Sequence, residues 1–95
     1  MSDVERWSEV VAAELGITSA VDVTAILELT KDVAHGVVRP AAPIAAYLLG
    51  LVAGADPARE AEAEATIRRL AQEWVPQELQ PQRHAGFALF LRRVP

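Results

Sequence analysis

Four residues in one short stretch have side chains that could do chemistry: Glu28, Asp32, His35 and Arg39. Their spacing is i, i+4, i+7 and i+11, so on a helix the first three would share one strip of the surface. An acid, a histidine and an arginine can supply a general base, a metal ligand or an anion contact. The spacing therefore predicts Asp32, His35 and Arg39 as candidate binding residues.

A structural interpretation competes with this one. The same strip would be the solvated side of an amphipathic helix, with His35 in the last turn, where the helix dipole favours positive charge. Arg39 could pair with Asp32 and brace the chain that follows. Because no nucleophile or second histidine is fixed nearby, no residue is assigned a catalytic role.

Metal and cofactor sites lack the residues that they need. Asp32 and His35 have the i, i+3 spacing of carboxylate-bridged metal bundles, but such sites need two of these motifs plus carboxylates from other helices. The only other histidine is His84, and there is no cysteine. No phosphate-binding glycine motif is present either. We expect no metal site and no cofactor.

The elements that must position these residues are predicted to be helices. Ser2 with Glu5 forms a capping box, Asp22 is a good N-cap, and Asp56-Pro57 suits a helix start. Few aromatic residues and many alanines also favour close-packed helices over strands. The prediction is an all-α fold, a small bundle of four helices at about 2–15, 22–35, 43–53 and 57–75.

Apolar periodicity predicts how these helices pack. The third helix is apolar on every side and is expected to be central and buried, with Gly50 in close contact with a neighbouring helix. Gly36, Pro40 and Pro43 are expected to form an extended elbow before it. The remaining helices are expected to pack through these residues: Val4, Trp7, Val11 and Leu15 in the first, Val23, Ile26, Leu27, Val33 and Ala34 in the second, and Ala63, Ile67, Leu70, Ala71 and Trp74 in the fourth.

Composition divides the chain into a helical bundle domain, residues 1–75, and a tail, residues 76–95. The tail begins with a Pro- and Gln-rich spacer and ends in an apolar and basic segment. Phe87, Phe90, Leu91 and Val94 have helical spacing, although Phe87, Leu89 and Leu91 would equally suit a strand. A helix this short needs a surface to pack on, which predicts docking on its own bundle or exchange between two copies in a homodimer.

Charge and hydropathy narrow the class of partner. Residues 1–75 hold 12 acidic and 6 basic residues, net -6, whereas residues 76–95 hold 1 and 3, net +2. A negative body repels phosphate backbones, so no nucleic-acid partner is expected. No apolar run is long enough to span a bilayer, and the N-terminus lacks the features of a signal peptide. We expect a cytoplasmic protein, and we rank an anionic membrane surface behind docking and exchange for the tail.

The stretch from Asp32 to Pro43, followed by Leu48-Leu49-Gly50-Leu51-Val52-Ala53-Gly54, resembles a small actinobacterial helical domain of unknown function. That domain occurs alone or appended to molybdenum-cofactor guanylyltransferase-like proteins. The resemblance covers roughly residues 2–75 and emphasises Asp32, His35 and Arg39 besides the elbow.

The resemblance implies a noncatalytic accessory or protein-interaction domain linked to molybdenum-cofactor biosynthesis. A protein partner or self-association is therefore expected. The alternative is a small ligand-binding or catalytic domain that uses Asp32, His35 and Arg39.

Overall fold

The computed structural model describes residues 2–75, and within them every regular element is a helix. This confirms the all-α prediction of four helices. The elements are α1 (Asp3–Glu14), α2 (Val23–Gly36), α3 (Ala41–Ala55), the 3-10 turn η1 (Pro57–Arg59) and α4 (Glu60–Glu73). None of these helices is long and apolar enough to cross a membrane.

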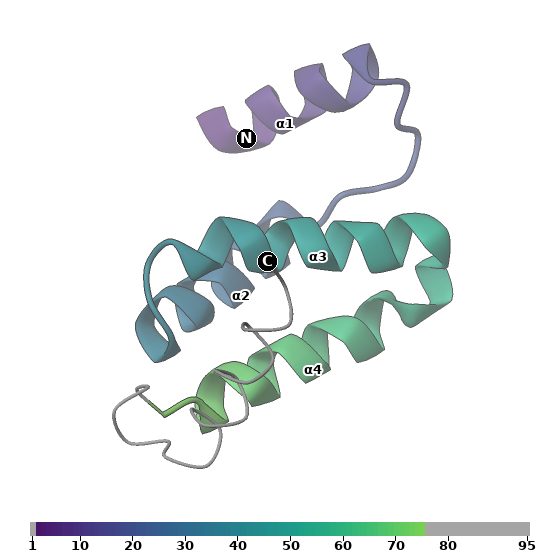
Figure 1. Cartoon of the computed structure of the whole chain (residues 1–95). Helices are drawn as coiled ribbons and strands as arrows, with labels where there is room; N and C mark the ends of the chain where they lie inside the picture. Colours follow the sequence, from purple (N-terminus) through teal and green to yellow (C-terminus); the bar gives the residue numbers. More distant parts are fainter. Residues whose placement is uncertain (1, 76–95) are drawn as a thin grey trace, which may run out of the picture.

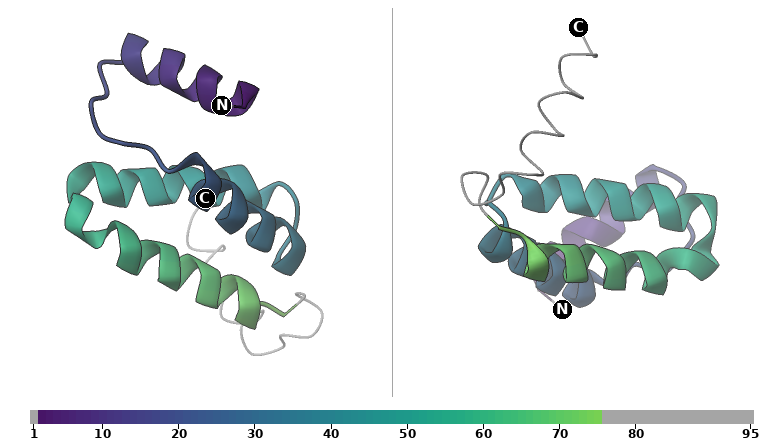
Figure 2. Two further views of the ribbon diagram at one scale, coloured as in Figure 1. Left: turned by 180° about the vertical axis from the view of Figure 1, so that it is seen from behind. Right: turned by 60° about the horizontal axis from the view of Figure 1, so that its bottom comes forward.

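Three of the helices form the packed body. α2, α3 and α4 each contact the other two, whereas α1 contacts α2 alone among the described helices. Figure 1 shows α1 set apart from the layer that contains α3 and α4, with α2 behind that layer, and the left view of Figure 2, seen from behind, brings α2 to the front. The tertiary structure is therefore a three-helix core with one loosely attached helix.

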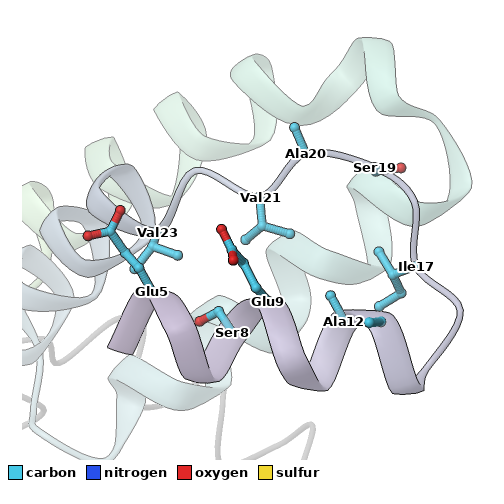
Figure 3. Close-up of a pocket in the computed structure, with 10 residues that line it drawn as sticks. Glu5, Ser8, Glu9, Ala12, Ile17, Ser19, Ala20, Val21 and Val23 are labelled. Atoms are coloured by element: carbon cyan, nitrogen blue, oxygen red, sulfur yellow. The ribbon is translucent and has the colours of Figure 1, made fainter. Parts of the chain in front are cut away.

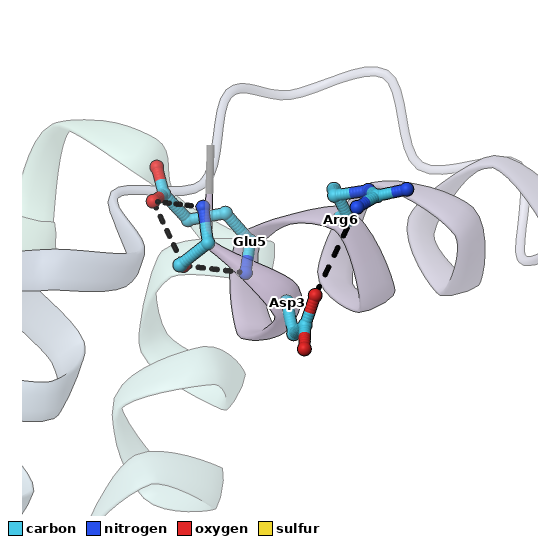
Figure 4. A network of polar contacts seen from close by, with 4 residues as sticks. Asp3, Glu5 and Arg6 are labelled. Carbon is cyan, nitrogen blue, oxygen red and sulfur yellow. Dashed lines mark hydrogen bonds and ion pairs between the residues drawn. The ribbon is translucent and has the colours of Figure 1, made fainter.

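The predicted helix starts are confirmed by their hydrogen bonds. Ser2 Oγ accepts from the Glu5 backbone N–H at 3.2 Å, and Glu5 Oε1 accepts from the Ser2 backbone N–H at 3.3 Å, which completes the capping box in Figure 4. Asp22 accepts from the N–H of Ala25 at 3.0 Å. These side chains satisfy backbone donors that a helix start leaves without partners.

The helix ends agree less well with the sequence. Gly16 follows α1 and has a φ of +73°, a left-handed conformation that ends a helix. The elbow is shorter than predicted, because α3 begins at Ala41 and includes Pro43 in its first turn. A proline is tolerated there since the N–H that it lacks has no partner within the helix. This helix was expected to end at residue 53, but α3 continues to Ala55.

The core consists of small and medium apolar side chains from the three packed helices. Within residues 2–75 five residues are buried: Leu29, Val33, Ala45, Leu49 and Ala71. The predicted stripe on α2 is partly wrong, because it includes Leu27, which is 48% exposed, and omits Leu29, which is 0% exposed. α2 packs against both α3 and α4, and the side that this packing buries carries Leu29 and Val33.

The close helix contact that the sequence predicted at Gly50 is found at Gly36 instead. A Cβ built on Gly36 would lie 2.7 Å from the carbonyl oxygen of Ala71, so α2 and α4 touch here through backbone. Gly50 was expected to make such a contact, but a Cβ there would meet nothing within 4 Å. Gly36 is thus a packing residue at the end of α2, and Gly50 faces open space in the described chain.

Large apolar side chains remain outside this core. On α1 no residue is buried, and Trp7 is 68% exposed although it was expected on a packing face. On α3 four residues are half exposed or more: Ile44, Tyr47, Leu48 and Leu51. The prediction of a buried third helix is therefore wrong for one side. α3 packs through Ala45 and Leu49 and leaves its opposite face to solvent.

Candidate functional site

Asp32 lies in a polar cluster between α2 and α4, and its partner is Arg68. Arg68 Nε donates to Asp32 Oδ2 at 3.0 Å, and Arg68 Nη1 lies 3.5 Å from Glu64 Oε1. The alternative pair between Asp32 and Arg39 is not formed in residues 2–75. The correction has a physical reason: Arg39 lies in the turn after α2, whereas Arg68 lies on a helix that packs alongside it.

We predict that Asp32 and Arg68 couple weakly to stability. Their side chains are 47% and 33% exposed, and ion pairs at such positions contribute about 0.2 to 1 kcal/mol. A double-mutant cycle with Asp32→Ala and Arg68→Ala should give a coupling free energy in that range, and it should fall as salt is added. Urea unfolding of the four proteins measures it.

The matched cycle pairs Asp32→Ala with Arg39→Ala and should show additive effects. A larger coupling for Arg39 than for Arg68 would contradict the structure. It would restore the pair that was expected from the sequence.

The other candidate residues are not gathered into one site. Glu28, His35 and Arg39 are exposed, and no hydrogen bond or ion pair in the described chain joins His35 to Asp32 or to Arg39. Across residues 2–75 there is no group of three metal-ligating side chains. The arrangement can place an acid and a histidine on the surface of α2, but it brings no third group to them.

A mixed polar and apolar pocket of about 400 Å³ lies between α1 and the connection to α2. Figure 3 shows Glu5 and Glu9 extending from α1 toward Val21 and Val23. Glu5 is held by the capping box, and Ser8 Oγ donates to the carbonyl of Val4 at 2.8 Å. None of the lining residues is a histidine, arginine or lysine. This pocket is a gap beside a loosely packed helix and holds no paired acid and base.

A uniformly apolar groove of about 360 Å³ lies where the end of α2 meets the start of α3 and the end of α4. We call it the α2–α4 groove. All ten residues that line it are apolar: Val33, Val37, Ala41, Ile44, Ala45, Leu48, Ile67, Leu70, Ala71 and Trp74. Its floor is the core cluster of Val33, Ala45 and Ala71. The groove can therefore accept apolar side chains and offers no charged contact of its own.

Sequence reasoning did not identify this groove. It assigned Leu70 and Trp74 to the packed side of the fourth helix, yet they are 49% and 45% exposed. One signal was available: a helix that is apolar all round presents more apolar surface than two neighbouring helices can cover.

The fold and surface describe a small all-α domain of four packed helices with an apolar groove. The chain belongs to a family defined as a domain of unknown function, DUF6457, whose model matches residues 1–82. This confirms that the resemblance to a helical domain of unknown function was correct at that level. No curated protein and no solved structure matches the chain.

Proposed function

We propose that this domain is a noncatalytic protein-interaction module that binds a partner protein through the α2–α4 groove and the adjoining exposed face of α3. The observation that carries the proposal is the groove itself, whose ten lining residues are all apolar. Ile44 and Leu48 line the groove and also belong to the exposed face, so the two form one continuous surface.

The energetics favour a partner on this surface. Single exposed apolar residues are ordinary on a globular protein, but a contiguous exposed apolar patch marks an interaction site. Covering apolar surface stabilises a complex by roughly 25 cal/mol per Å² before the costs of association. A groove between helices suits an apolar helix, which would insert side chains spaced three and four residues apart.

The geometry gives less support to a ligand-binding or catalytic function at Asp32, His35 and Arg39. A general base needs a carboxylate that can reach a substrate proton, and the Asp32 carboxylate accepts a hydrogen bond from Arg68 at 3.0 Å. Arg39 and His35 remain candidate contacts at the edge of a bound partner, because both lie near the end of α2, where the groove begins.

The proposed partner is a molybdenum-cofactor guanylyltransferase-like protein. The resemblance of residues 32–54 to a domain that occurs appended to such proteins supports this choice. An appended domain acts at high effective concentration on its neighbour, and the α2–α4 groove would supply the surface that contacts that neighbour.

Calorimetric titration of the full chain with the guanylyltransferase-like protein of the same genome tests the proposal. We expect Leu48→Gln to weaken binding about tenfold or more, because it places an amide in an apolar contact. Leu27→Gln is the matched control, since Leu27 is 48% exposed, Leu48 is 50% exposed, and Leu27 does not line the groove.

Equal losses from the two variants would contradict the assignment of the surface. A complete absence of binding by the unmodified chain would remove the proposed link with molybdenum-cofactor biosynthesis. Far-UV circular dichroism on each variant checks that the helices are retained.

A further inference from the structure

We infer that the α2–α4 groove is occupied in cis by the chain's own residues 87–94, packed as a short helix through Phe87, Phe90, Leu91 and Val94. These residues lie outside the described part of the chain. The inference goes beyond the proposed function, because it names an intramolecular occupant and needs no partner protein for its test.

The groove lies where the chain leaves the described helices. Trp74 lines the groove and is also the residue at which α4 ends, with an extended φ of −66° and ψ of 135°. The chain therefore turns out of the helix at the edge of the groove. Residues 76–86 then separate this edge from the apolar segment, and 11 residues can reach about 36 Å when extended.

The lengths of groove and segment agree. The α3 residues that line the groove fall within 41–48, and the α4 residues fall within 67–74, so each wall is eight residues long. Residues 87–94 are also eight, and as a helix they would extend about 12 Å, like each wall. A return of the chain along these walls needs only part of the reach of residues 76–86.

The residue pattern suits an apolar groove with no polar wall. On a helix Phe87, Phe90, Leu91 and Val94 share one side, whereas Leu89 and Arg92 lie away from it. Such a segment is too short to be a stable helix alone in water and needs a surface that covers its apolar side. The groove offers that surface at the nearest point of the folded chain.

Charge favours the same pairing. Residues 1–75 have a net charge of -6 and residues 76–95 a net charge of +2. Opposite net charges draw the two parts together, and the attraction weakens as salt is added. With its apolar side in the groove, the segment would keep Arg92 and Arg93 in solvent.

The experiment uses Trp74 as a reporter of the groove. The chain has two tryptophans, so Trp7→Phe leaves Trp74 alone, and Trp7 is exposed enough to be replaced without loss of packing. In this background we expect Phe90→Ala to raise acrylamide quenching of Trp74 at least about twofold and to shift its emission to the red. The melting temperature should fall by roughly 5 to 10 °C.

Leu89→Ala is the matched control and should change neither value, because Leu89 lies on the other side of the proposed helix. Equal effects of the two variants, or unchanged quenching with Phe90→Ala, overturn the inference.

Sedimentation provides the second measurement. A chain that is monomeric throughout supports docking in cis, whereas a dimer that dissociates with Phe90→Ala overturns it in favour of exchange between copies. Because the proposed partner uses the same groove, it would have to displace this segment. Failure of the quenching test removes the segment from the groove, whereas failure of the titration removes the partner, so the two outcomes are distinguishable.

Discussion

Leu29→Ala should lower the free energy of unfolding by about 2 to 5 kcal/mol, the largest loss expected from one substitution in this chain. Leu29 is the single large side chain that is fully buried in residues 2–75, at 0% exposure. The other buried residues are Val33, Ala45, Leu49 and Ala71, which are no larger than leucine. A cavity at Leu29 removes apolar contacts that a core of this size cannot replace by relaxation.

The expected loss is a large fraction of the total free energy of unfolding. A domain of this length has a total stability of roughly 5 to 10 kcal/mol, so the variant should be close to unfolding at room temperature. Urea unfolding followed by circular dichroism at low temperature measures the midpoint and slope. Leu27→Ala makes the same chemical change two residues earlier on α2, at a side chain 48% exposed, and should cost about 0.5 kcal/mol or less.

Similar losses from Leu27→Ala and Leu29→Ala would contradict the rotation of α2 that the structure shows. The pair therefore tests which side of the helix faces the core, and the total stability does not enter the comparison.

The sequence was sufficient for the fold class and for three of the N-caps. Ser2, Asp22 and Asp56 each accept a hydrogen bond from a backbone N–H two or three residues ahead, as their positions predicted. A cap depends on residues within one turn of each other, so local sequence contains all the information that it needs.

The relative rotation of the helices was not contained in the sequence pattern. α3 is apolar on every side, so periodicity could not select the side with Ala45 and Leu49 over the side with Tyr47 and Leu51. Leu29 was missed for a different reason. Leu27 and Leu29 are both leucines, two residues apart on α2, and they differ in the neighbours that the fold supplies.

The partner of Asp32 was missed for a related reason. Asp32 and His35 were correctly placed on one helix, and spacing along that helix is a local property. The partner of Asp32 is Arg68, 36 residues further along the chain. A pairing across that separation depends on how α2 and α4 pack, and no spacing rule within one helix reports it. Whether Asp32, His35 and Arg39 bind a ligand stays a prediction.

Gly36→Ala should destabilise the protein, whereas Gly50→Ala should stabilise it, although both replace a glycine within a helix. In a helix interior alanine is favoured over glycine by about 1 kcal/mol, because glycine loses more backbone freedom on folding. Gly50 has open space around its Cα in the described chain, so Gly50→Ala should gain roughly that amount. Gly36→Ala has a smaller gain, since Gly36 is the last residue of α2.

The loss at Gly36 comes from the contact between two backbones. The new Cβ would lie 2.7 Å from the carbonyl oxygen of Ala71 and 3.3 Å from its carbonyl carbon, and a buried backbone cannot rotate away as a side chain could. α2 and α4 would have to separate, and overpacking of this kind costs about 1 to 3 kcal/mol. Urea unfolding of both variants should therefore give midpoints on opposite sides of that of the unmodified chain. A Gly36→Ala variant as stable as Gly50→Ala would show that the two helices do not approach this closely. The floor of the α2–α4 groove, which Ala71 forms with Val33 and Ala45, would then need a different geometry.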